Sequence, residues 1–239
     1  MKILSIGNSF SQNAQRYLYK LAKHNGEEIK TVNLYIGGCA LRTHYLNILD
    51  NAIAYDLQYN GESTGVRVSI KQVLLSEEWD VVTLQQASHF SGKEETYSPY
   101  VEELASYVRK YCPRVKLFLH QTWAYEKDSK RLLEIGGFAT PRDMYTAICK
   151  ANEKAAKAID ADGIIPCGKA MLIASETGIE KVHSDTFHAS YGAGQYLLAL
   201  CWYKKLLGKD IANDTFNEFD VPVSEEERKI VISAVNSAF

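Results

Sequence analysis

The chain has 239 residues, of which 46% are hydrophobic and 23% are charged, and its formal net charge at pH 7 is −2. This length and this ordinary globular composition suit one well-buried core, so we expect a single domain over residues 1–239. A nearly neutral chain without a basic stripe argues against a nucleic-acid partner. No apolar run approaches the roughly eighteen residues of a transmembrane helix, so we expect no membrane partner.

The amino terminus and the cysteines indicate the compartment. The apolar run at residues 3–6 ends at Gly7, which is too short for a secretory signal peptide. We therefore expect a cytoplasmic protein, or a secreted one if a leader has been removed from this sequence. The five cysteines are odd in number and none has CxxC spacing, which argues against a disulfide framework and against a zinc site. We expect buried, reduced thiols.

Short apolar runs alternate with longer amphipathic stretches along the chain. This alternation is typical of an α/β protein with a parallel sheet and helices on both faces. In chain order we predict strand 2–6, helix 13–25, strand 29–35, helix 41–54, hairpin 55–70, helix 71–76, strand 80–84, helix 96–111, strand 115–122, helix 143–159, strand 163–166, helix 190–207 and helix 224–237. Ser224 and Glu227 form a capping-box sequence at the start of the last helix.

Residues 55–70 interrupt the α/β alternation. An alternating run that begins at Tyr55 leads to the turn signal Asn60-Gly61, and a second alternating run follows. This pattern predicts a β-hairpin inserted into the fold. A lid and a dimer element are both compatible with such an insertion.

Polar and glycine-containing segments follow the predicted strands. In open parallel sheets, ligands bind beyond the carboxyl ends of the strands. The segments at this edge are 7–11, 37–39, 85–89, 122–123 and 167–168, together with 183–188 before a helix. One edge of the sheet therefore collects a serine, backbone glycines, amides and an Asp/His pair, which is the set that a serine hydrolase needs.

Ser9, His188 and Asp185 are the candidate catalytic residues. A serine hydroxyl becomes a nucleophile when a neighbouring base takes its proton, and a histidine can take that proton and return it to the leaving group. An aspartate fixes the imidazole tautomer and stabilises the imidazolium. We predict that the backbone N–H groups of Ser9 and Gly38 form the oxyanion hole, since a residue without Cβ allows close approach of the backbone.

These segments resemble the motifs of the SGNH (GDSL-like) hydrolases. The block Gly-Asn-Ser-Phe-Ser at 7–11 is similar to their first motif, Gly38 to the glycine of their second, and Asp185-x-x-His188 to their last. The match in order and placement covers nearly the full chain. Stretches at 84–88, 122–124, 165–168 and 191–194 resemble a little-characterised branch, known as a domain of unknown function, that is found largely in bacteria.

The resemblance implies a flavodoxin-like three-layer α/β/α sandwich with a five-stranded parallel sheet of order 2-1-3-4-5, and esterase chemistry. Typical members carry Gly-x-Asn-Asp in the third motif, where the Asn is a third oxyanion donor. The corresponding segment 85–89 contains no Asn. Gln85 is the first candidate for a substitute amide donor and Gln86 is the second.

The implied activity is an acetylesterase-type hydrolysis of small acyl esters, with acetylated carbohydrate as one substrate class. We expect Asn8, Ser88 and Trp123 to contact the substrate, since an aromatic ring at this edge suits a sugar. His183 could compete as the base, but the family spacing favours His188. The mechanism requires no metal, and we expect no cofactor.

Two other functions are compatible with parts of the sequence. A flavodoxin-like nucleotide- or flavin-binding domain would hold phosphate in loop 7–11, but that loop is neither a P-loop nor a G-x-G-x-x-G sequence. A catalytically degenerate SGNH scaffold that binds glycans would explain the missing third-motif Asn. The intact Ser9, Asp185 and His188 argue against this second alternative.

Overall fold

The structure, a computed structural model, describes residues 1–179 and 181–239. Its centre is a seven-stranded sheet with the order β4-β3-β2-β1-β5-β6-β7. The strands that pair in parallel are β1 (Lys2–Gly7), β2 (Lys30–Tyr35), β5 (Val81–Leu84), β6 (Lys116–His120) and β7 (Gly163–Ile165). Numbered in chain order, these five strands have the predicted arrangement 2-1-3-4-5.

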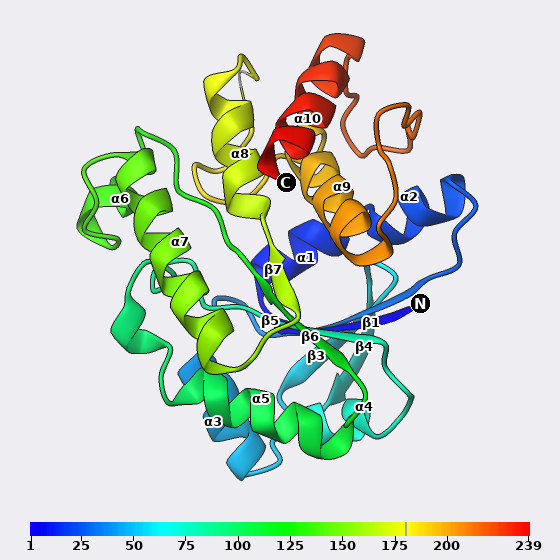
Figure 1. Ribbon diagram of the computed structural model, residues 1–239, viewed down its shortest axis with the longest axis vertical. Helices are drawn as coiled ribbons and strands as arrows, with labels where there is room; N and C mark the ends of the chain where they lie inside the picture. Colours follow the sequence, from blue (N-terminus) through cyan, green and yellow to red (C-terminus); the bar gives the residue numbers. More distant parts are fainter. Residues whose placement is uncertain (180) are drawn as a thin grey trace.

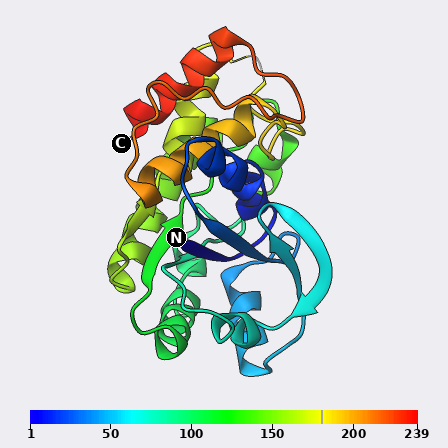
Figure 2. The same cartoon turned by 90° about the vertical axis from the view of Figure 1, so that its right-hand side faces the viewer.

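The hairpin predicted at 55–70 belongs to the central sheet. β3 (Tyr55–Tyr59) pairs antiparallel with β2, and β4 (Glu62–Val68) pairs antiparallel with β3, so five strands was too low a count for the whole sheet. The turn lies beside the start of β2, where the Thr31 N–H donates to Asn60 Oδ1 at 2.9 Å. The turn therefore lies at the amino ends of the parallel strands, and the hairpin extends the sheet rather than covering its carboxyl edge as a lid would (Figure 2).

Helices cover both faces of the sheet (Figure 1). One face carries α1 (Ser9–Gln15), α2 (Leu18–His24), α8 (Cys167–Glu176), α9 (Ala193–Leu207) and α10 (Glu225–Ala238). The other face carries α3 (Leu41–Leu49), α4 (Ile70–Leu74) and α5 (Tyr100–Tyr111). The short α6 (Lys130–Glu134) precedes α7 (Pro141–Ala158), which packs beside the edge strand β7. The result is the predicted α/β/α sandwich.

Each face of the sheet has its own hydrophobic core. In β1, Ile3 belongs to the core under α1 and α9, whereas Leu4 belongs to the core under α3 and α5. Successive side chains of a strand point to opposite faces, so a central strand buried on both sides reads as a continuous apolar run. This burial explains why the short core strands were recognisable in the sequence.

Some helices differ from their predicted bounds. The helix predicted at 13–25 is two helices, and the first begins at Ser9 because Asn8 caps it, with its Oδ1 accepting from Phe10 N at 3.0 Å. Helix α8 was not predicted. Six of its ten residues are buried, so it lacks the one-sided apolar stripe by which a surface helix is recognised. The predicted capping box of Ser224 and Glu227 is present in α10.

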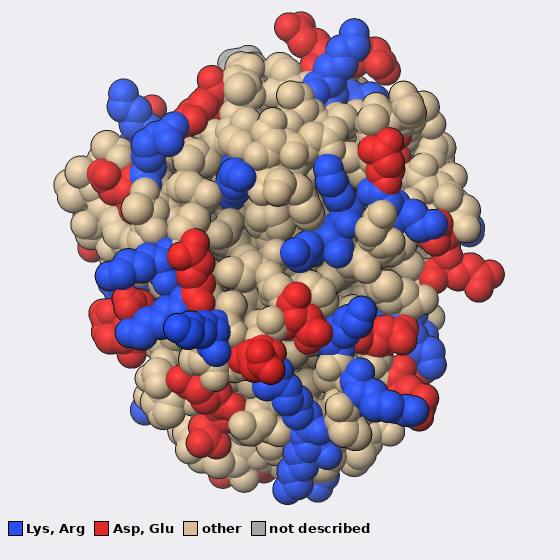
Figure 3. Space-filling view, viewed as in Figure 1, with Lys and Arg blue, Asp and Glu red and all other residues tan. Residues whose placement is uncertain are grey.

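The surface agrees with the nearly neutral composition. On the face shown in Figure 3, basic and acidic side chains are interspersed. Within residues 1–179 and 181–239, none of the helices combines the length and the apolar character that crossing a membrane requires.

Candidate active site

Ser9, His188 and Asp185 lie together at the carboxyl edge of the sheet. Ser9 Oγ is 2.8 Å from His188 Nε2, and His188 Nδ1 is 2.7 Å from Asp185 Oδ2. The His188 backbone N–H also donates to Asp185 Oδ1 at 2.8 Å. Folding thus brings a hydroxyl, an imidazole and a carboxylate into one hydrogen-bonded chain, although Ser9 and His188 are 179 positions apart. This arrangement can activate a hydroxyl for nucleophilic attack.

The tight turn between β1 and α1 presents the Ser9 side chain. A Cβ on Gly7 would lie 2.3 Å from Ser11 Oγ and 3.2 Å from Gln85 Cδ, so only glycine lets the strand end, the helix and β5 approach this closely. Ser9 is the first residue of α1 and is half-buried. The turn therefore leaves its hydroxyl at the surface of the carboxyl edge.

The loop that carries the histidine is a narrow hairpin docked on α1. His183 and Ala189 form an antiparallel bridge, and between them Ser184 N donates to the His188 carbonyl at 2.9 Å. Ala189 N also donates to Asn13 Oδ1 at 3.1 Å. Asn13 is not among the site residues predicted from the sequence, although it stands one helical turn after Ser9 and hence on the same face of α1.

His183 is turned to other partners. Its Nε2 lies 3.1 Å from the Ala124 carbonyl oxygen and its Nδ1 lies 3.4 Å from Glu126 Oε1. Burial lowers its pKa to about 4, so it is neutral at physiological pH. The structure therefore pairs Ser9 with His188 and not with His183.

The Asp185 carboxyl is held in its charged form. Burial raises its pKa, but the hydrogen bonds from the ring and the backbone of His188 outweigh burial, and the pKa lies below its ordinary value. A carboxylate beside Nδ1 fixes the tautomer that leaves Nε2 free to accept a proton from Ser9.

A buried chain of side-chain amides lies beneath Ser9. Asn8 Oδ1 accepts from Phe10 N at 3.0 Å, and Asn8 Nδ2 donates to the Cys39 carbonyl at 2.9 Å. These two backbone partners determine which end of the Asn8 amide is oxygen. The 2.6 Å contact between Asn8 Oδ1 and Gln85 must therefore be a donation from Gln85 Nε2.

The same reasoning determines the tautomer of His120. Gln85 Oε1 faces His120 Nδ1 at 2.8 Å, so Nδ1 carries the proton. All three side chains of this His120–Gln85–Asn8 relay are buried. The sequence predicted Gln85 as a substitute amide donor to the oxyanion. In the structure its Nε2 donates to Asn8 instead and is not directed at the site.

Gln86, the second candidate donor, joins three loops. Its Oε1 accepts from Leu41 N at 3.0 Å and from Ala87 N at 2.9 Å, and its Nε2 donates to the Thr96 carbonyl at 2.9 Å. The Gln86 side chain is buried among these partners. The geometry gives it a structural role rather than an oxyanion role.

Two backbone donors remain near the nucleophile. Within the described residues, neither the Ser9 N–H nor the Gly38 N–H has a hydrogen-bond acceptor. Gly38 has a φ of +63°, which residues with a Cβ rarely adopt. The Asn8–Cys39 hydrogen bond ties the loop of Gly38 to the turn of Ser9. The pair can serve as an oxyanion hole.

The three predicted substrate contacts differ in exposure. Asn8 and Trp123 are 1% and 0% exposed, so neither forms the surface of the site. Trp123 instead stacks on Phe10 at 4.1 Å and donates from Nε1 to the Phe187 carbonyl at 2.8 Å, which supports the histidine loop from below. Ser88 is half-buried, with its Oγ 2.9 Å from the Tyr125 hydroxyl, and it alone of the three is accessible.

Two buried histidines lead to a prediction about acid stability. Burial lowers the pKa of His44 and His120 from 6.5 to about 3, so both are neutral in the folded chain at pH 4 but protonated in the unfolded chain. The unfolded state binds more protons, so the free energy of unfolding should fall as the pH drops from 6.5, by about 3 kcal/mol per histidine at pH 4. Urea denaturation at pH 7 and pH 4 measures this loss.

His44→Gln should reduce the difference between the two pH values, because it removes one of the groups that titrate only on unfolding. His24→Gln is the control, since His24 is exposed and should leave the difference unchanged. Equal free energies of unfolding at pH 7 and pH 4 in the unaltered protein would contradict the prediction.

The side chains around the site offer neither a metal-ligand cluster nor a reactive thiol in the described residues. In the part of the chain that the structure describes, no three His, Cys, Asp or Glu side chains are grouped so that they could hold a metal. Burial raises the pKa of the Cys39 thiol, beside Gly38, to about 12. That thiol therefore stays protonated and is no competitor to Ser9 as a nucleophile.

The sequence and the structure were compared with known proteins. Residues 2–238 match the family described as a domain of unknown function, DUF4886. No curated protein matches the chain. The structure is similar to a DUF4886 family protein from Bacteroides uniformis, with 32% identity, a TM-score of 0.93, and coverage of 100% of this chain and 94% of that one.

Two solved structures are more distant. A candidate SGNH hydrolase from Slackia heliotrinireducens is 22% identical, with a TM-score of 0.62 over 86% of this chain and 98% of its own. The acetylxylan esterase Axe2 from Geobacillus stearothermophilus is 16% identical, with a TM-score of 0.55 over 85% of this chain and 92% of its own. Both share the fold. The chain therefore belongs to the DUF4886 family and has the fold of the SGNH hydrolases.

Proposed function

We propose that the protein is a serine hydrolase that cleaves small acyl esters, acetyl esters among them, with O-acetylated carbohydrate as one substrate class. The observation that carries the proposal is the Ser9–His188–Asp185 chain, with successive contacts of 2.8 and 2.7 Å. Ser9 Oγ attacks the ester carbonyl while His188 Nε2 takes the hydroxyl proton, and Asp185 stabilises the imidazolium that results.

The reaction then proceeds through an acyl-enzyme. The first tetrahedral intermediate collapses when His188 protonates the leaving alcohol, which leaves the acyl group on Ser9. A water that gives its proton to His188 attacks this ester, and the second intermediate releases the carboxylic acid as Ser9 regains its proton. The N–H groups of Ser9 and Gly38 are assigned to both oxyanions, where one good donor contributes about 3 kcal/mol.

The relay explains how an oxyanion hole could work without the third-motif Asn. Asn8 holds the turn of Ser9 through Phe10 N and the loop of Gly38 through the Cys39 carbonyl. Gln85 and His120 hold the Asn8 amide in turn. In this proposal they are positioning residues: they do not touch the substrate, but they set the distance between the two backbone donors.

The degenerate glycan-binding scaffold is the second candidate. One observation favours it: the Gln85 amide is committed to Asn8 and His120, so it supplies no third donor to an oxyanion. The hydrogen-bonded triad favours the hydrolase, because a scaffold without catalysis has no need to keep three such side chains aligned.

Hydrolysis of p-nitrophenyl esters tests the proposal. We expect turnover of the acetate and slower turnover as the acyl chain lengthens. A fluorophosphonate should add its phosphonyl group to the protein, and peptide mass spectrometry should locate that group on Ser9. Failure of both hydrolysis and labelling would reject the hydrolase and favour the glycan-binding scaffold.

A further inference from the structure

The partners of the arginines distinguish two of them from the rest. Of the eight arginines in the chain, those with a carboxylate or backbone-carbonyl partner are Arg16, Arg67, Arg109, Arg114, Arg142 and Arg228. Across residues 1–179 and 181–239, Arg42 and Arg131 have neither kind of partner, and both are exposed. An exposed guanidinium without a partner is available to an anion.

Both arginines stand at the edge of the sheet that holds the triad. Arg42 follows β2 and the loop of Gly38, whereas Arg131 is in α6, which follows β6. In the sheet, β2 and β6 lie on opposite sides of β1, the strand that leads to Ser9. The two guanidinium groups therefore come from the segments that follow β2 and β6, on either side of the strand that leads to Ser9.

Arg131 lies on an aromatic platform that touches the base of the triad. Its Cζ is 4.3 Å from the centre of the Phe187 ring, and the Phe187 ring is 4.0 Å from the His188 ring. Tyr125 packs edge-on against Phe187 at 5.9 Å, and Trp123 holds the Phe187 backbone. A guanidinium over a ring face keeps its N–H edges free for a ligand.

Another cationic group, Lys93, comes from the loop that follows β5. Lys93 Nζ donates to the carbonyl of Ile135 at 3.2 Å, which ties the β5 loop to the segment just after α6. Burial, and then the charges of Lys93 and Arg131, lower the pKa of His89. The acidic residues Glu126 and Asp128 line a neighbouring cleft of about 490 Å³, whose lining includes Tyr125 but not Arg131.

We propose that Arg131, aided by Arg42, selects an ester that carries a negative charge, such as a carboxylate or a phosphate, on its acyl or its alcohol part. The inference rests on the proposed function and names the substrate class. A planar guanidinium binds such a group through two parallel N–H donors. The chain as a whole has a net charge of −2, so a local cationic rim is what would bring an anionic ester to Ser9.

Matched pairs of esters test the proposal. Mono-p-nitrophenyl succinate and its methyl ester differ in the charge of the acyl part, and 4-acetoxybenzoate and its methyl ester differ in the charge of the alcohol part. For each pair we take the ratio of kcat/KM for the anion to that for the neutral ester. Arg131→Gln should lower this ratio by about tenfold for at least one pair, while kcat/KM for the neutral ester of that pair should change little. The preference of the unaltered protein should weaken with added salt.

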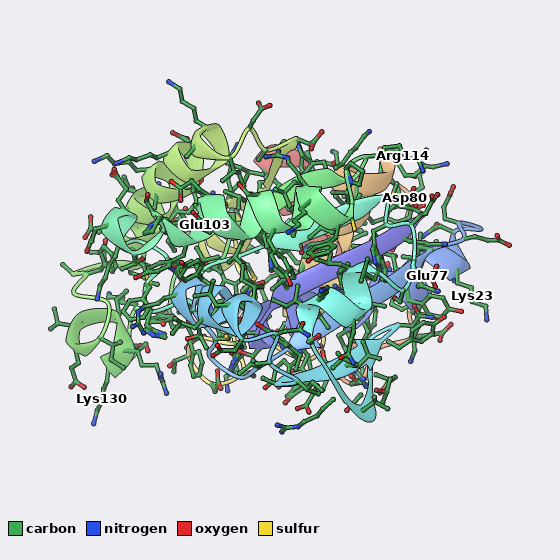
Figure 4. The ribbon with its side chains drawn as sticks, turned by 90° about the horizontal axis from the view of Figure 1, so that it is seen from below. Lys23, Glu77, Asp80, Glu103, Arg114 and Lys130 are labelled. Atoms are coloured by element: carbon green, nitrogen blue, oxygen red, sulfur yellow. The ribbon has the colours of Figure 1, made fainter. Side chains whose placement is uncertain are left out.

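Lys130→Gln is the matched control, because it removes the same charge from the neighbouring position of α6. Figure 4 shows Lys130 at the rim of the molecule with its side chain pointing outward. The anion-to-neutral ratio of kcat/KM for Lys130→Gln should equal that of the unaltered protein. The proposal would be overturned if the ratio fell equally in the Lys130 and Arg131 variants. It would also be overturned if Arg131→Gln lowered kcat/KM equally for both esters of each pair.

A binding measurement separates this proposal from the proposed hydrolysis. In the Ser9→Ala protein, calorimetry should show monomethyl succinate binding more tightly than dimethyl succinate, and Arg131→Gln in that background should remove the difference. If the unaltered protein hydrolyses no ester but this difference is present, hydrolysis is refuted and the anion site stands. If the anion and the neutral ester bind alike, the anion site is refuted whatever the activity.

Discussion

Ser9→Ala is expected to lower kcat for p-nitrophenyl acetate by about 10⁴-fold or more, with KM nearly unchanged. In the proposed reaction the hydroxyl oxygen of Ser9 bonds to the acyl group, and this oxygen lies 2.8 Å from His188 Nε2. Alanine leaves the imidazole, the Asp185 carboxylate and the backbone donors in place. The remaining activity would come from these groups alone, without a covalent intermediate.

Ser106→Ala is the control for this prediction, because Ser106 is exposed on α5, on the other face of the sheet. Both variants should unfold at the same urea concentration as the unaltered protein, so that any lost activity reports chemistry rather than folding. A Ser9→Ala protein that kept the full rate would show that another residue is the nucleophile.

Gln85→Glu should lower kcat by about 10²-fold at neutral pH and should recover activity as the pH falls. The introduced carboxylate would place an oxygen against Asn8 Oδ1, where Gln85 Nε2 now donates at 2.6 Å. Repulsion there would disturb the turn of Ser9 and the loop of Gly38, and a displacement near 1 Å at a catalytic group costs about 10²-fold. The oxyanion develops only as the ester carbonyl is attacked and is absent from the bound substrate, so kcat should change more than KM.

The direction of the pH effect follows from burial. A carboxyl in this buried position has a raised pKa, so it becomes protonated as the pH falls and can then donate to Asn8 Oδ1 as the amide does. The quantity to measure is the rate of the variant divided by the rate of the unaltered protein at each pH, since the titration of the triad cancels in that quotient. We expect the quotient to rise toward acid pH.

Gln85→Met provides the comparison, because methionine removes the donor without adding a titratable group. Its quotient should be low and independent of pH. A pH-independent quotient for Gln85→Glu as well would mean that the relay supports folding but does not position the oxyanion donors.

Much of the fold was readable from local pattern. Buried strands such as β5 (Val81–Leu84) are mainly apolar because each face of the sheet has a core, and α10 begins at the predicted Ser224 cap because its partners lie within four residues. The likeness of the motifs to SGNH hydrolases added the strand order. The place of the hairpin was not readable, since its alternating pattern reveals two strands but not the strand, β2, with which they pair.

The sequence alone identified Ser9, Asp185 and His188 as candidates, because each stands in a short motif at the end of a strand or before a helix. Only the tertiary structure decided what surrounds them. It directs the Gln85 amide to Asn8 and His120, buries Trp123 beneath Phe187, and sets Arg131 over Phe187. Such contacts join loops from distant parts of the chain, whereas the periodicity of a segment records only the burial of its own side chains. The direction of a side chain depends on those distant partners, and that is why the sequence could name the three candidates but not the contacts that support them.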